Sequence, residues 1–409
     1  MSEKWKSVAE TREFILSRIV PVCGEERVPL RGLLGRVLAE DAAAPFDVPG
    51  FDNSAMDGYA CRAADLSAES ESVLREAGRA FAGAPCAAAV ASGGCVRIMT
   101  GAQIPAGADI VVPQEETRAD GGRVFVAAAA RKKGLHIRRA GEDLRRGEAA
   151  IAAGTLCGAA EIGLLGSIGM AEAAAVRKVR AAFFSTGDEL KSLGDVLRPG
   201  EIYDSNRHLI FAMLQNMNIE TRDLGVAPDS RRALEKMMDA AMEDADVVIA
   251  SGGASVGEAD FIRPALAARG EVLSWKVAMR PGRPLAYGKL GGADFFGLPG
   301  NPVSVMVCFY QFAREALWKR AGRKGCVSAP LFSAVAGAPF RKSPGRAEYQ
   351  RGVLRARACG GCDVFPTGGQ GSGILSSMSR ANCFVVLEES RGAVAAGEEV
   401  QVQLFEGLM

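Results

Sequence analysis

The segment DADVVIASGGASVGEAD, residues 244–260, gives the strongest indication of the fold. Residues 247–250 form a short apolar run, which is typical of a strand buried on both faces of a parallel sheet. Residues 251–253, Ser-Gly-Gly, follow directly, and a glycine turn after such a strand lets backbone N–H groups approach a phosphate closely. Two acids, Glu258 and Asp260, come next and would repel that phosphate unless a cation lay between them. The segment therefore predicts a parallel α/β sheet whose edge binds phosphate together with Mg²⁺.

The surrounding residues 176–325 alternate between strand and helix patterns, which favours the same sheet. The strand VRAAFFSTGDEL ends in a second glycine turn, followed by Asp188 and Glu189. Because the carboxyl ends of parallel strands meet at one edge, we expect these acids to lie near Glu258 and Asp260. Glycine turns beside carboxylates indicate phosphoanhydride chemistry with a hard divalent cation. The alternative is that each acid is an ordinary solvated loop residue.

Two proline-rich loops suggest a separate site for an oxyanion. The segment MRPGRPLAYG holds Arg280 and Arg283 around a Pro-Gly turn. In FFGLPGNPVSVM, Asn301 is placed to cap a helix whose first residue is Pro302. Ser304 would then lie in the first turn, where free N–H groups attract anions. We predict an oxyanion site provided that the two loops meet in space. Otherwise Asn301 is only a helix cap and the arginines are surface charges.

Composition and charge exclude several classes of function. The chain has 409 residues, with 49 basic and 48 acidic side chains and a net charge of +1, and the absence of a basic block argues against nucleic-acid binding. No apolar run reaches the roughly 20 residues of a membrane span, and the charged start MSEKWKSVAE does not resemble a secretory signal. Ten cysteines are scattered without a disulfide framework. We therefore expect a cytoplasmic protein without a membrane partner.

Several polar residues have ordinary structural interpretations. Only His136 and His208 are present, which nearly excludes a multi-histidine metal site, and we interpret both as structural. Cys359 and Cys362 flank a Gly-Gly pair and predict a hairpin turn rather than half of a zinc site. Asp229, in APDSRRALEK, fits a helix N-cap.

The pattern along the rest of the chain predicts a multidomain α/β protein. Residues 7–20 carry a helical pattern that ends at Pro21, and residues 60–146 contain short strand-like pieces. Residues 328–409 lose helical periodicity and are typical of strands joined by turns. We expect a central α/β domain with a parallel-type sheet, a β-rich inserted domain and a C-terminal all-β domain.

Six motifs in order resemble one protein family. They are FDNSAMDGYA (51–60), TGAQIPAGAD (100–109), STGDEL (185–190), SGGASVGEAD (251–260), GLPGNPVS (297–304) and GSGILSSM (371–378). Together they look like the MoeA-type molybdopterin molybdenumtransferases, which are related to the E domain of gephyrin. The family commonly has Lys-Pro-Gly-Lys-Pro where this chain has Arg-Pro-Gly-Arg-Pro, and arginine also serves an oxyanion.

The resemblance implies four structural parts. They are an N-terminal linking domain of residues 1–44 and 147–175, an inserted β-rich domain of residues 45–146, an α/β molybdopterin-binding domain of residues 176–327, and a C-terminal β domain of residues 328–409. It also implies a homodimer in which Asp57 and Thr100 of one chain face the partner subunit's Asp260.

The resemblance further implies an enzyme of molybdenum cofactor biosynthesis. Such enzymes take molybdate and adenylylated molybdopterin, release AMP with the help of Mg²⁺, and place molybdenum on the pterin dithiolene. Molybdopterin adenylyltransferase would supply the substrate, and molybdoenzymes or their chaperones would receive the product.

The functional residues of the family carry over by motif. The catalytic acids and hydroxyl would be Asp57, Thr100, Asp143, Glu189, Asp229 and Asp260, with Glu189 and Asp260 as metal ligands. The pterin and its phosphate would be held by Ser251, Gly252, Gly253, Ser255, Pro299 and Pro302. Molybdate would be held by Arg280, Arg283, Ser304, Arg346 and Ser372.

Alternatives from other classes stay open at this point. A non-catalytic scaffold like gephyrin would not need the acids. A tungstate-inserting homologue would have the same sequence features, because tungstate and molybdate are nearly equal in size and charge. A different Mg²⁺-dependent phosphohydrolase would not need the FDNSAMDGYA segment.

Overall fold

A computed structural model describes residues 5–252, 269–325 and 328–405. The chain divides into two compact units. The first comprises Met1–Ala39, Ala153–Gly158 and Ala174–Met409, and the second comprises Glu40–Ala152 and Ala159–Ala173. The expected multidomain α/β architecture is confirmed, because the first unit holds an α/β sheet and a separate β sheet while the second is rich in strands. The division into four parts stays a prediction.

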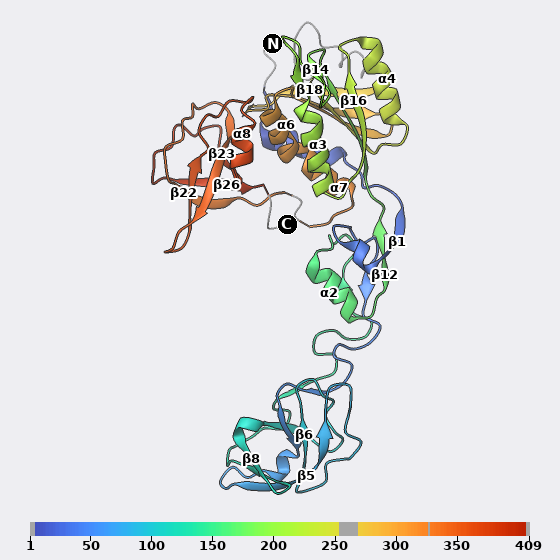
Figure 1. Ribbon diagram of the computed structural model, residues 1–409, viewed down its shortest axis with the longest axis vertical. Helices are drawn as coiled ribbons and strands as arrows, with labels where there is room; N and C mark the ends of the chain where they lie inside the picture. The colour runs from blue at the N-terminus through green and yellow to red at the C-terminus, as the bar shows by residue number, and fades with distance from the viewer. Residues whose placement is uncertain (1–4, 253–268, 326–327, 406–409) are drawn as a thin grey trace. The chain divides into compact units, whose positions relative to one another are not determined.

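A six-stranded sheet forms the centre of the first unit (Figure 1). Its order is β16-β13-β17-β21-β20-β18, with β13 (Arg180–Thr186), β16 (Glu220–Ala227), β17 (Val247–Ser251), β18 (Gly270–Lys276), β20 (Pro284–Leu290) and β21 (Ala293–Leu298). The first four strands in this order are parallel, as the sequence predicted. β20 runs antiparallel to its neighbours β21 and β18, so β18 has the same direction as the first four strands. The sheet is therefore mixed, because β21 turns back on β20 through a short hairpin.

Helices cover both faces of this sheet. They include α1 (Val8–Arg18), α3 (Ser205–Asn216), α4 (Arg231–Met242), α6 (Pro302–Cys308) and α7 (Arg314–Arg320). Phe183 and its neighbour Phe184 are both fully buried but point to opposite faces, since side chains alternate along a strand. Phe183 belongs to the core with α1, α3, α6 and α7, and Phe184 belongs to the core with α4. This two-sided burial explains the continuous apolar runs of the strands.

The segment PVSVMVCFYQFAREALWKRAG, residues 302–322, has the sequence pattern of one long helix. The structure has α6 and α7 joined by a π-helical turn, η4 (Phe309–Ala313). A π-helical turn contains one residue more than an α-helical turn. All five residues of η4 are buried, so the wider turn lies within the core.

The C-terminal part of the first unit is a second six-stranded sheet of order β19-β23-β24-β22-β26-β25. Its strands are β19 (Met279–Arg280), β22 (Phe332–Ala336), β23 (Ala347–Ala356), β24 (Cys362–Pro366), β25 (Cys383–Leu387) and β26 (Glu399–Leu404). β23 also pairs with β25, which curls the sheet on itself. Cys359 and Cys362 flank a β23–β24 hairpin with Gly360 and Gly361 at positive φ, as expected. A short helix, α8 (Ser376–Arg380), interrupts this otherwise all-β part.

The second unit contains a six-stranded sheet of order β7-β4-β6-β5-β9-β8. Its strands are β4 (Gly58–Cys61), β5 (Ser72–Ala80), β6 (Gly94–Ile98), β7 (Ile110–Pro113), β8 (Thr117–Asp120) and β9 (Arg123–Val126). Shorter pairs join β3 (Asn53–Ser54) to β10 (Ile137–Arg138) and β2 (Ala42–Ala43) to β11 (Ala149–Ile151), and α2 spans Ala159–Ser167. A Cβ on Gly58 would lie 2.0 Å from the Val112 carbonyl oxygen, so only glycine fits at this point of β4.

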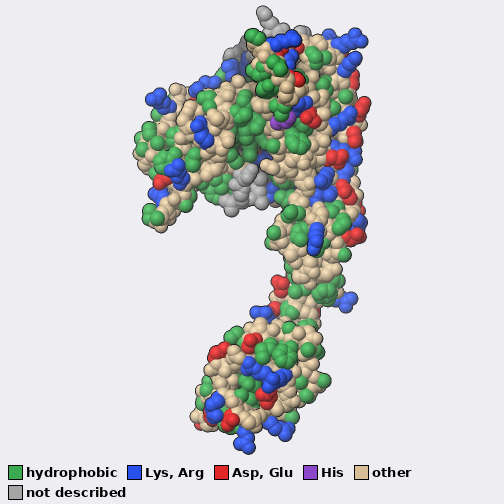
Figure 2. All heavy atoms as spheres, viewed as in Figure 1, with side chains coloured by type: hydrophobic (Ala, Val, Ile, Leu, Met, Phe, Trp, Pro, Cys, Tyr) green, Lys and Arg blue, Asp and Glu red, His purple; other side chains and the backbone are tan. Residues whose placement is uncertain are grey.

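The remaining short elements are β1 (Glu25–Pro29), β12 (Glu172–Val176), β14 (Leu190–Lys191), β15 (Ile202–Tyr203), and the 3₁₀ turns η1 (Leu30–Leu33), η2 (Ala63–Asp65) and η3 (Gln114–Glu116). Basic and acidic side chains are interspersed along the edge of the first unit that carries α4 and β16 (Figure 2). No helix in the described parts of the chain is both long and apolar enough to cross a membrane.

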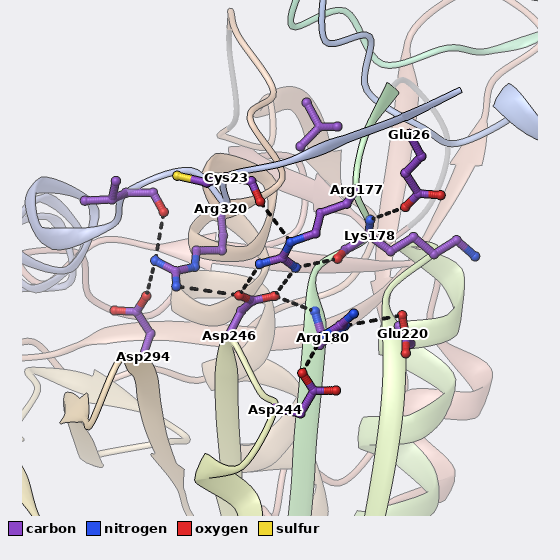
Figure 3. Close-up of polar contacts among 12 residues, drawn as sticks. Cys23, Glu26, Arg177, Lys178, Arg180, Glu220, Asp244, Asp246, Asp294 and Arg320 are labelled. Carbon is purple, nitrogen blue, oxygen red and sulfur yellow. Dashed lines mark hydrogen bonds and ion pairs between the residues drawn. The ribbon is translucent and has the colours of Figure 1, made fainter. Parts of the chain in front are cut away.

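A network of ion pairs lies at the amino ends of the parallel strands (Figure 3). The guanidinium of Arg177 donates to both carboxylate oxygens of Asp246, at 2.8 Å each. The backbone N–H of Arg180 donates to the same carboxylate at 2.9 Å. Arg320 lies 3.9 Å from Asp246 and 3.4 Å from the buried Asp294, and so joins β17 to β21. Burial alone would raise the pKa of Asp246, but these donors outweigh it and hold the pKa below its usual value.

We predict that Asp246→Asn destabilises the protein by about 2–4 kcal/mol at pH 7, because it leaves Arg177 without its buried partner. A carboxylate with a lowered pKa stabilises the fold above its unfolded pKa of about 3.9 and loses this effect as the pH falls through the folded value. The difference between wild type and variant should therefore shrink below about pH 4. Urea unfolding at several pH values measures it, and an equal difference at pH 7 and pH 3 would contradict the ion-pair explanation.

Candidate functional site

The carboxyl ends of β13 and β17 lie side by side at one edge of the central sheet. Their register pairs Ser185 with Ser251, and Ser251 with Leu298 of β21. Gly252 follows β17 with a φ of 107°, and a Cβ there would lie 2.4 Å from the carbonyl oxygen of Thr186. Only glycine permits this approach, because a side chain would collide with backbone. The two turns therefore meet, as their positions after neighbouring strands predicted.

An asparagine at the start of α3 joins the loops at this edge. The side-chain amide of Asn206 donates to Ser251 Oγ at 2.9 Å and to the Gly300 carbonyl at 2.6 Å. Asp204 caps α3 by accepting from the Arg207 N–H at 3.2 Å, and it also accepts from Ser185 Oγ at 3.1 Å. All of these side chains are buried or partly buried, so the bonds fix the loops strongly.

The sequence reasoning did not select Asp204 and Asn206 as site residues. In the sequence, the segment YDSNR fits a helix start, which accounts for both residues without a site. The signal in the sequence was Asn206, a second polar residue two positions after Asp204, because Asp204 alone is sufficient to cap the helix.

Three acids gather beside these turns. Asp188 accepts a hydrogen bond from the backbone N–H of Asp229 at 3.0 Å. The carboxylate of Glu189 turns back over Gly187, where a Cβ would lie only 2.6 Å from Oε2. Asp229 does not cap α4, as its position suggested, because Ser230 is the N-cap and accepts from the Ala233 N–H. Asp229 lies one residue earlier and is held by Asp188.

Without a bound cation, the carboxylates of Asp188, Glu189 and Asp229 repel one another. Partial withdrawal from water, followed by the negative charges of Asp188 and Glu189, raises the pKa of the Asp229 carboxyl. The arrangement would be relieved by a bound cation.

Gly253, Ser255 and Asp260, three residues predicted for this site, lie outside the described residues, as does Glu258. Across residues 5–252, 269–325 and 328–405, no three His, Cys, Asp or Glu side chains converge closely enough to hold a metal ion. The metal pair Glu189 and Asp260 therefore stays a prediction.

The arginine loop and the start of α6 meet in space. Gly282 lies in the loop that carries Arg280 and Arg283 (the arginine loop), and its carbonyl accepts from Sγ of Cys308, the last residue of α6, at 3.4 Å. A Cβ on Gly282 would lie 2.7 Å from this sulfur and 3.6 Å from the carbonyl oxygen of Ser304 in the first turn of α6. β19 runs parallel to β23 and pairs Arg280 with Glu348, whose carboxylate lies 3.7 Å from the guanidinium. Arg346 immediately precedes β23 and therefore lies near this loop. The spatial condition set for the oxyanion site is thus fulfilled.

The start of α6 differs in detail from the expected anion site. Asn301 is at the N-cap position with Pro302 after it, but the Asn301 side chain makes no capping hydrogen bond. The N–H of Val303 donates instead to the Ser372 carbonyl at 3.2 Å. Ser304 is buried. The structure therefore brings Ser372 to the helix, but one of the N–H groups expected to be free is already used.

A cleft of about 430 Å³ adjoins this region and contains a buried arginine that the sequence reasoning missed. Arg351 is 1% exposed, and it donates to Ser377 Oγ at 3.0 Å and to the Gly371 carbonyl at 3.1 Å. Burial, followed by the charge of Arg280, lowers the pKa of Arg351 to about 10. Among the described residues its guanidinium has no carboxylate partner. The signal in the sequence was an arginine inside the strand pattern EYQRGVLRA, which predicts a strand but not the burial of Arg351.

The predicted site residues of the second unit lie at the end of its sheet. Thr100 donates to Asp57 Oδ1 from its N–H at 2.8 Å and from its hydroxyl at 2.7 Å. These two bonds hold the pKa of Asp57 below its usual value, so the carboxylate stays ionised. Asp143 lies on an exposed turn and donates its N–H to the Val48 carbonyl at 3.0 Å. No contact joins Asp143 to Asp57 within the described residues.

Comparison with known protein families covers nearly the whole chain. The model of the MoeA N-terminal region (domain I and II) matches residues 6–169. The model of a probable molybdopterin binding domain matches residues 182–319. The model of the MoeA C-terminal region (domain IV) matches residues 333–405.

Individual relatives agree with these matches. The chain is 42% identical over 384 residues to a molybdopterin molybdenumtransferase of Haemophilus influenzae, covering 94% of this chain and 95% of the relative. It is 35% identical to molybdopterin molybdenumtransferase 2 of Mycobacterium tuberculosis, covering 97% and 99%. The crystal structure of a molybdopterin biosynthesis MoeA protein from Pyrococcus horikoshii matches with a TM-score of 0.85 and 28% identity, covering 98% of this chain and 100% of that one.

We predict that Asp229→Asn stabilises the protein at pH 7, by no more than about 1 kcal/mol because the group is exposed and screened. A carboxyl with a raised pKa favours the fold below its unfolded pKa, and that contribution is lost as the pH rises through the folded value. The amide cannot ionise, so the variant avoids this loss and the two proteins should converge below about pH 4.

Thermal unfolding measures the effect. Asp239→Asn is the matched control on α4, since hydrogen bonding to Arg269 lowers the pKa of Asp239 and its replacement should shift stability in the opposite direction. A loss of stability in Asp229→Asn would contradict the proposed repulsion.

Proposed function

The chain belongs to the MoeA family of molybdopterin molybdenumtransferases, enzymes of molybdenum cofactor biosynthesis, and we propose that it inserts molybdate into adenylylated molybdopterin with release of AMP. The observation that carries this proposal is the connection between the arginine loop and the turn that follows β17 at Ser251 and Gly252, which we call the phosphate turn. Asn206 bonds Ser251 to the Gly300 carbonyl, and a Cβ on Gly300 would lie 3.8 Å from Gly252 Cα. α6 begins two residues after Gly300, and the Gly282 carbonyl accepts from Cys308 Sγ of α6. A phosphate and a second oxyanion could therefore be held side by side.

In this proposal the turn after β17 binds the phosphate end of the substrate. Ser251 offers a hydroxyl that Asn206 already orients, and Gly252 leaves the backbone open to an anion. Pro299 and Pro302 flank Gly300 and limit its movement, so little conformational freedom is lost on binding.

Molybdate would bind between the arginine loop and the start of β23. Arg280, Arg283 and Arg346 bring three permanent positive charges to two neighbouring segments. A guanidinium donates paired N–H bonds to adjacent oxygens of a tetrahedral dianion. Ser372 and Ser304 border this region through α6.

The acids at the sheet edge suit Mg²⁺ as a cofactor. Glu189 offers hard oxygen donors there, and Asp188 and Asp229 add negative charge nearby, while partial withdrawal from water and the charges of Asp188 and Glu189 raise the pKa of Asp229. We propose that Glu189 and Asp260 hold the ion and that Asp229 supports them. When bound, Mg²⁺ would neutralise charge on the phosphoanhydride as AMP leaves.

The proposed assembly is a homodimer whose two clefts each use both chains. Asp57 and Thr100 would then face the phosphate turn of the other subunit, with Asp143 nearby in the same unit. The support from this chain is that Asp57 is kept ionised by Thr100 although it serves no ion pair within the described residues. A molybdopterin adenylyltransferase would supply the substrate, and molybdoenzymes or their chaperones would take the product, all in the cytoplasm.

Tungstate is a tetrahedral dianion of similar size and would fit the same site as molybdate. A scaffold without catalysis would not need these acids, whose mutual repulsion costs stability. The unpaired cluster at Asp188, Glu189 and Asp229 is thus the feature that favours an enzyme.

We predict that Glu189→Gln lowers turnover on the order of 100-fold, because the amide keeps the size of the side chain but removes the charge that binds the cation. Thermal stability should stay unchanged, since Glu189 is exposed. Molybdenum insertion from adenylylated molybdopterin is the assay. Glu243→Gln, an exposed acid after α4, is the matched control and should keep wild-type turnover. Wild-type turnover in Glu189→Gln would refute the role of this acid.

We predict that mixed dimers reveal the shared cleft. A heterodimer of Thr100→Ala and Glu189→Gln chains should regain about half of the wild-type activity, because one of its two clefts carries neither substitution. A heterodimer of wild type with the Thr100→Ala/Glu189→Gln double variant should be nearly inactive, because each cleft then carries one substitution. The reverse order of activities would mean that each cleft belongs to a single chain.

A further inference from the structure

An exposed tryptophan near the N-terminus contacts two arginines of the proposed molybdate site. The guanidinium of Arg283 lies 4.4 Å from the centre of the Trp5 ring, and that of Arg346 lies 5.8 Å from it. Both distances are within the range of cation–π attraction. Trp5 is separated from these residues by more than 270 positions in the sequence, so the contact is purely tertiary.

The backbone around Trp5 is fixed to the same segments. Lys6 forms a parallel bridge with Val277, and the Ala278 N–H donates to the Lys6 carbonyl at 2.8 Å. The Val277 N–H donates to the Arg283 carbonyl at 2.9 Å. The indole ring is therefore carried by a chain segment that is hydrogen-bonded to the base of the arginine loop.

The kind of contact matters for binding. Within the described parts of the chain, neither Arg283 nor Arg346 forms an ion pair, whereas Arg280 faces Glu348. A guanidinium that lies over an aromatic ring uses its flat face, so its N–H groups remain free in its plane. The ring also partly offsets the repulsion between two like charges held close together. Arg283 and Arg346 are thus ordered without being neutralised.

We propose that Trp5 is a positioning residue that holds Arg283 and Arg346 ready to bind a tetrahedral oxyanion. This inference rests on the proposed binding of molybdate at these arginines. Trp5 touches the cations and not the reacting atoms, so it should affect the affinity for molybdate and leave the chemical step unchanged.

Two substitutions separate the aromatic face from simple bulk. Trp5→Leu keeps an apolar side chain but removes the ring, and it should raise the half-saturating molybdate concentration by about threefold to tenfold without lowering maximal turnover. Trp5→Phe keeps a ring and should stay within about twofold of wild type. Phe14→Leu is the matched control, because Phe14 holds the cations of Lys6 and Arg18 on the same N-terminal segment but contacts neither site arginine.

Fluorescence gives a readout that does not depend on turnover. The chain has only three tryptophans, so the emission lost in Trp5→Phe belongs to Trp5. Molybdate added alone to the full-length protein should change that part of the emission, at the concentrations that saturate turnover.

The results distinguish an error in the role of Trp5 from an error in the molybdate site. Trp5→Leu with wild-type molybdate dependence, or an effect of equal size in Phe14→Leu, would overturn the positioning role. A Trp5 emission that molybdate leaves unchanged would overturn it as well. If Arg283→Ala and Arg346→Ala also need no more molybdate than wild type, then the proposed molybdate site itself is wrong.

Discussion

The aligned register of β13, β17 and β21 is the constraint on which the candidate site depends. Parallel hydrogen bonding sets Ser185, Ser251 and Leu298 at one level, so the three loops that follow all begin at the same edge. The amide of Asn206 then bonds two of these loops at once, and α6 starts directly after the third strand. The arginine loop contacts α6 through Gly282, so the sheet also determines where this loop lies. A shift of one residue in β17 would disconnect all of these contacts.

Carboxylates at the two edges of the same sheet have opposite surroundings, with donors at one edge and other carboxylates at the other. At the amino edge Asp246 and Asp294 are buried, and each is surrounded by donors, so charge there contributes to stability. At the carboxyl edge Asp188 and Asp229 lie near Glu189 with no cation in contact among the described residues, and partial withdrawal from water together with the charges of Asp188 and Glu189 raises the pKa of Asp229. Repulsion of this kind lowers stability and is removed when a cation binds. The contrast within one sheet distinguishes acids that stabilise the fold from acids available to a ligand.

The positive side of the site follows a similar rule. Arg351 is bound by a hydroxyl and a carbonyl, and Arg283 and Arg346 lie against an aromatic ring. None of these contacts cancels the positive charge, whereas Arg280 has a carboxylate at 3.7 Å. Cations that are ordered by neutral groups keep their attraction for an oxyanion and lose little freedom when one binds. Ordering by uncharged groups is therefore the property that the buried Arg351 shares with the exposed Arg283 and the half-buried Arg346.

The sequence by itself determined those features that depend on neighbouring residues. Apolar runs and helical periodicity specified the strands and helices of the central sheet, the glycine turns after β13 and β17, and the hairpin between Cys359 and Cys362, because each results from local sterics and burial. Ordered motifs were sufficient to indicate the family. Only the tertiary structure decided which partner each polar group takes. Asp229 could have capped α4 as well as Ser230 does, and the carboxylate of Asp188, 41 positions away, determined the outcome. Asn206, Arg351 and Trp5 were not selected because their partners are distant in the chain, and hydrogen bonds and cation–π contacts leave no periodic trace in a sequence.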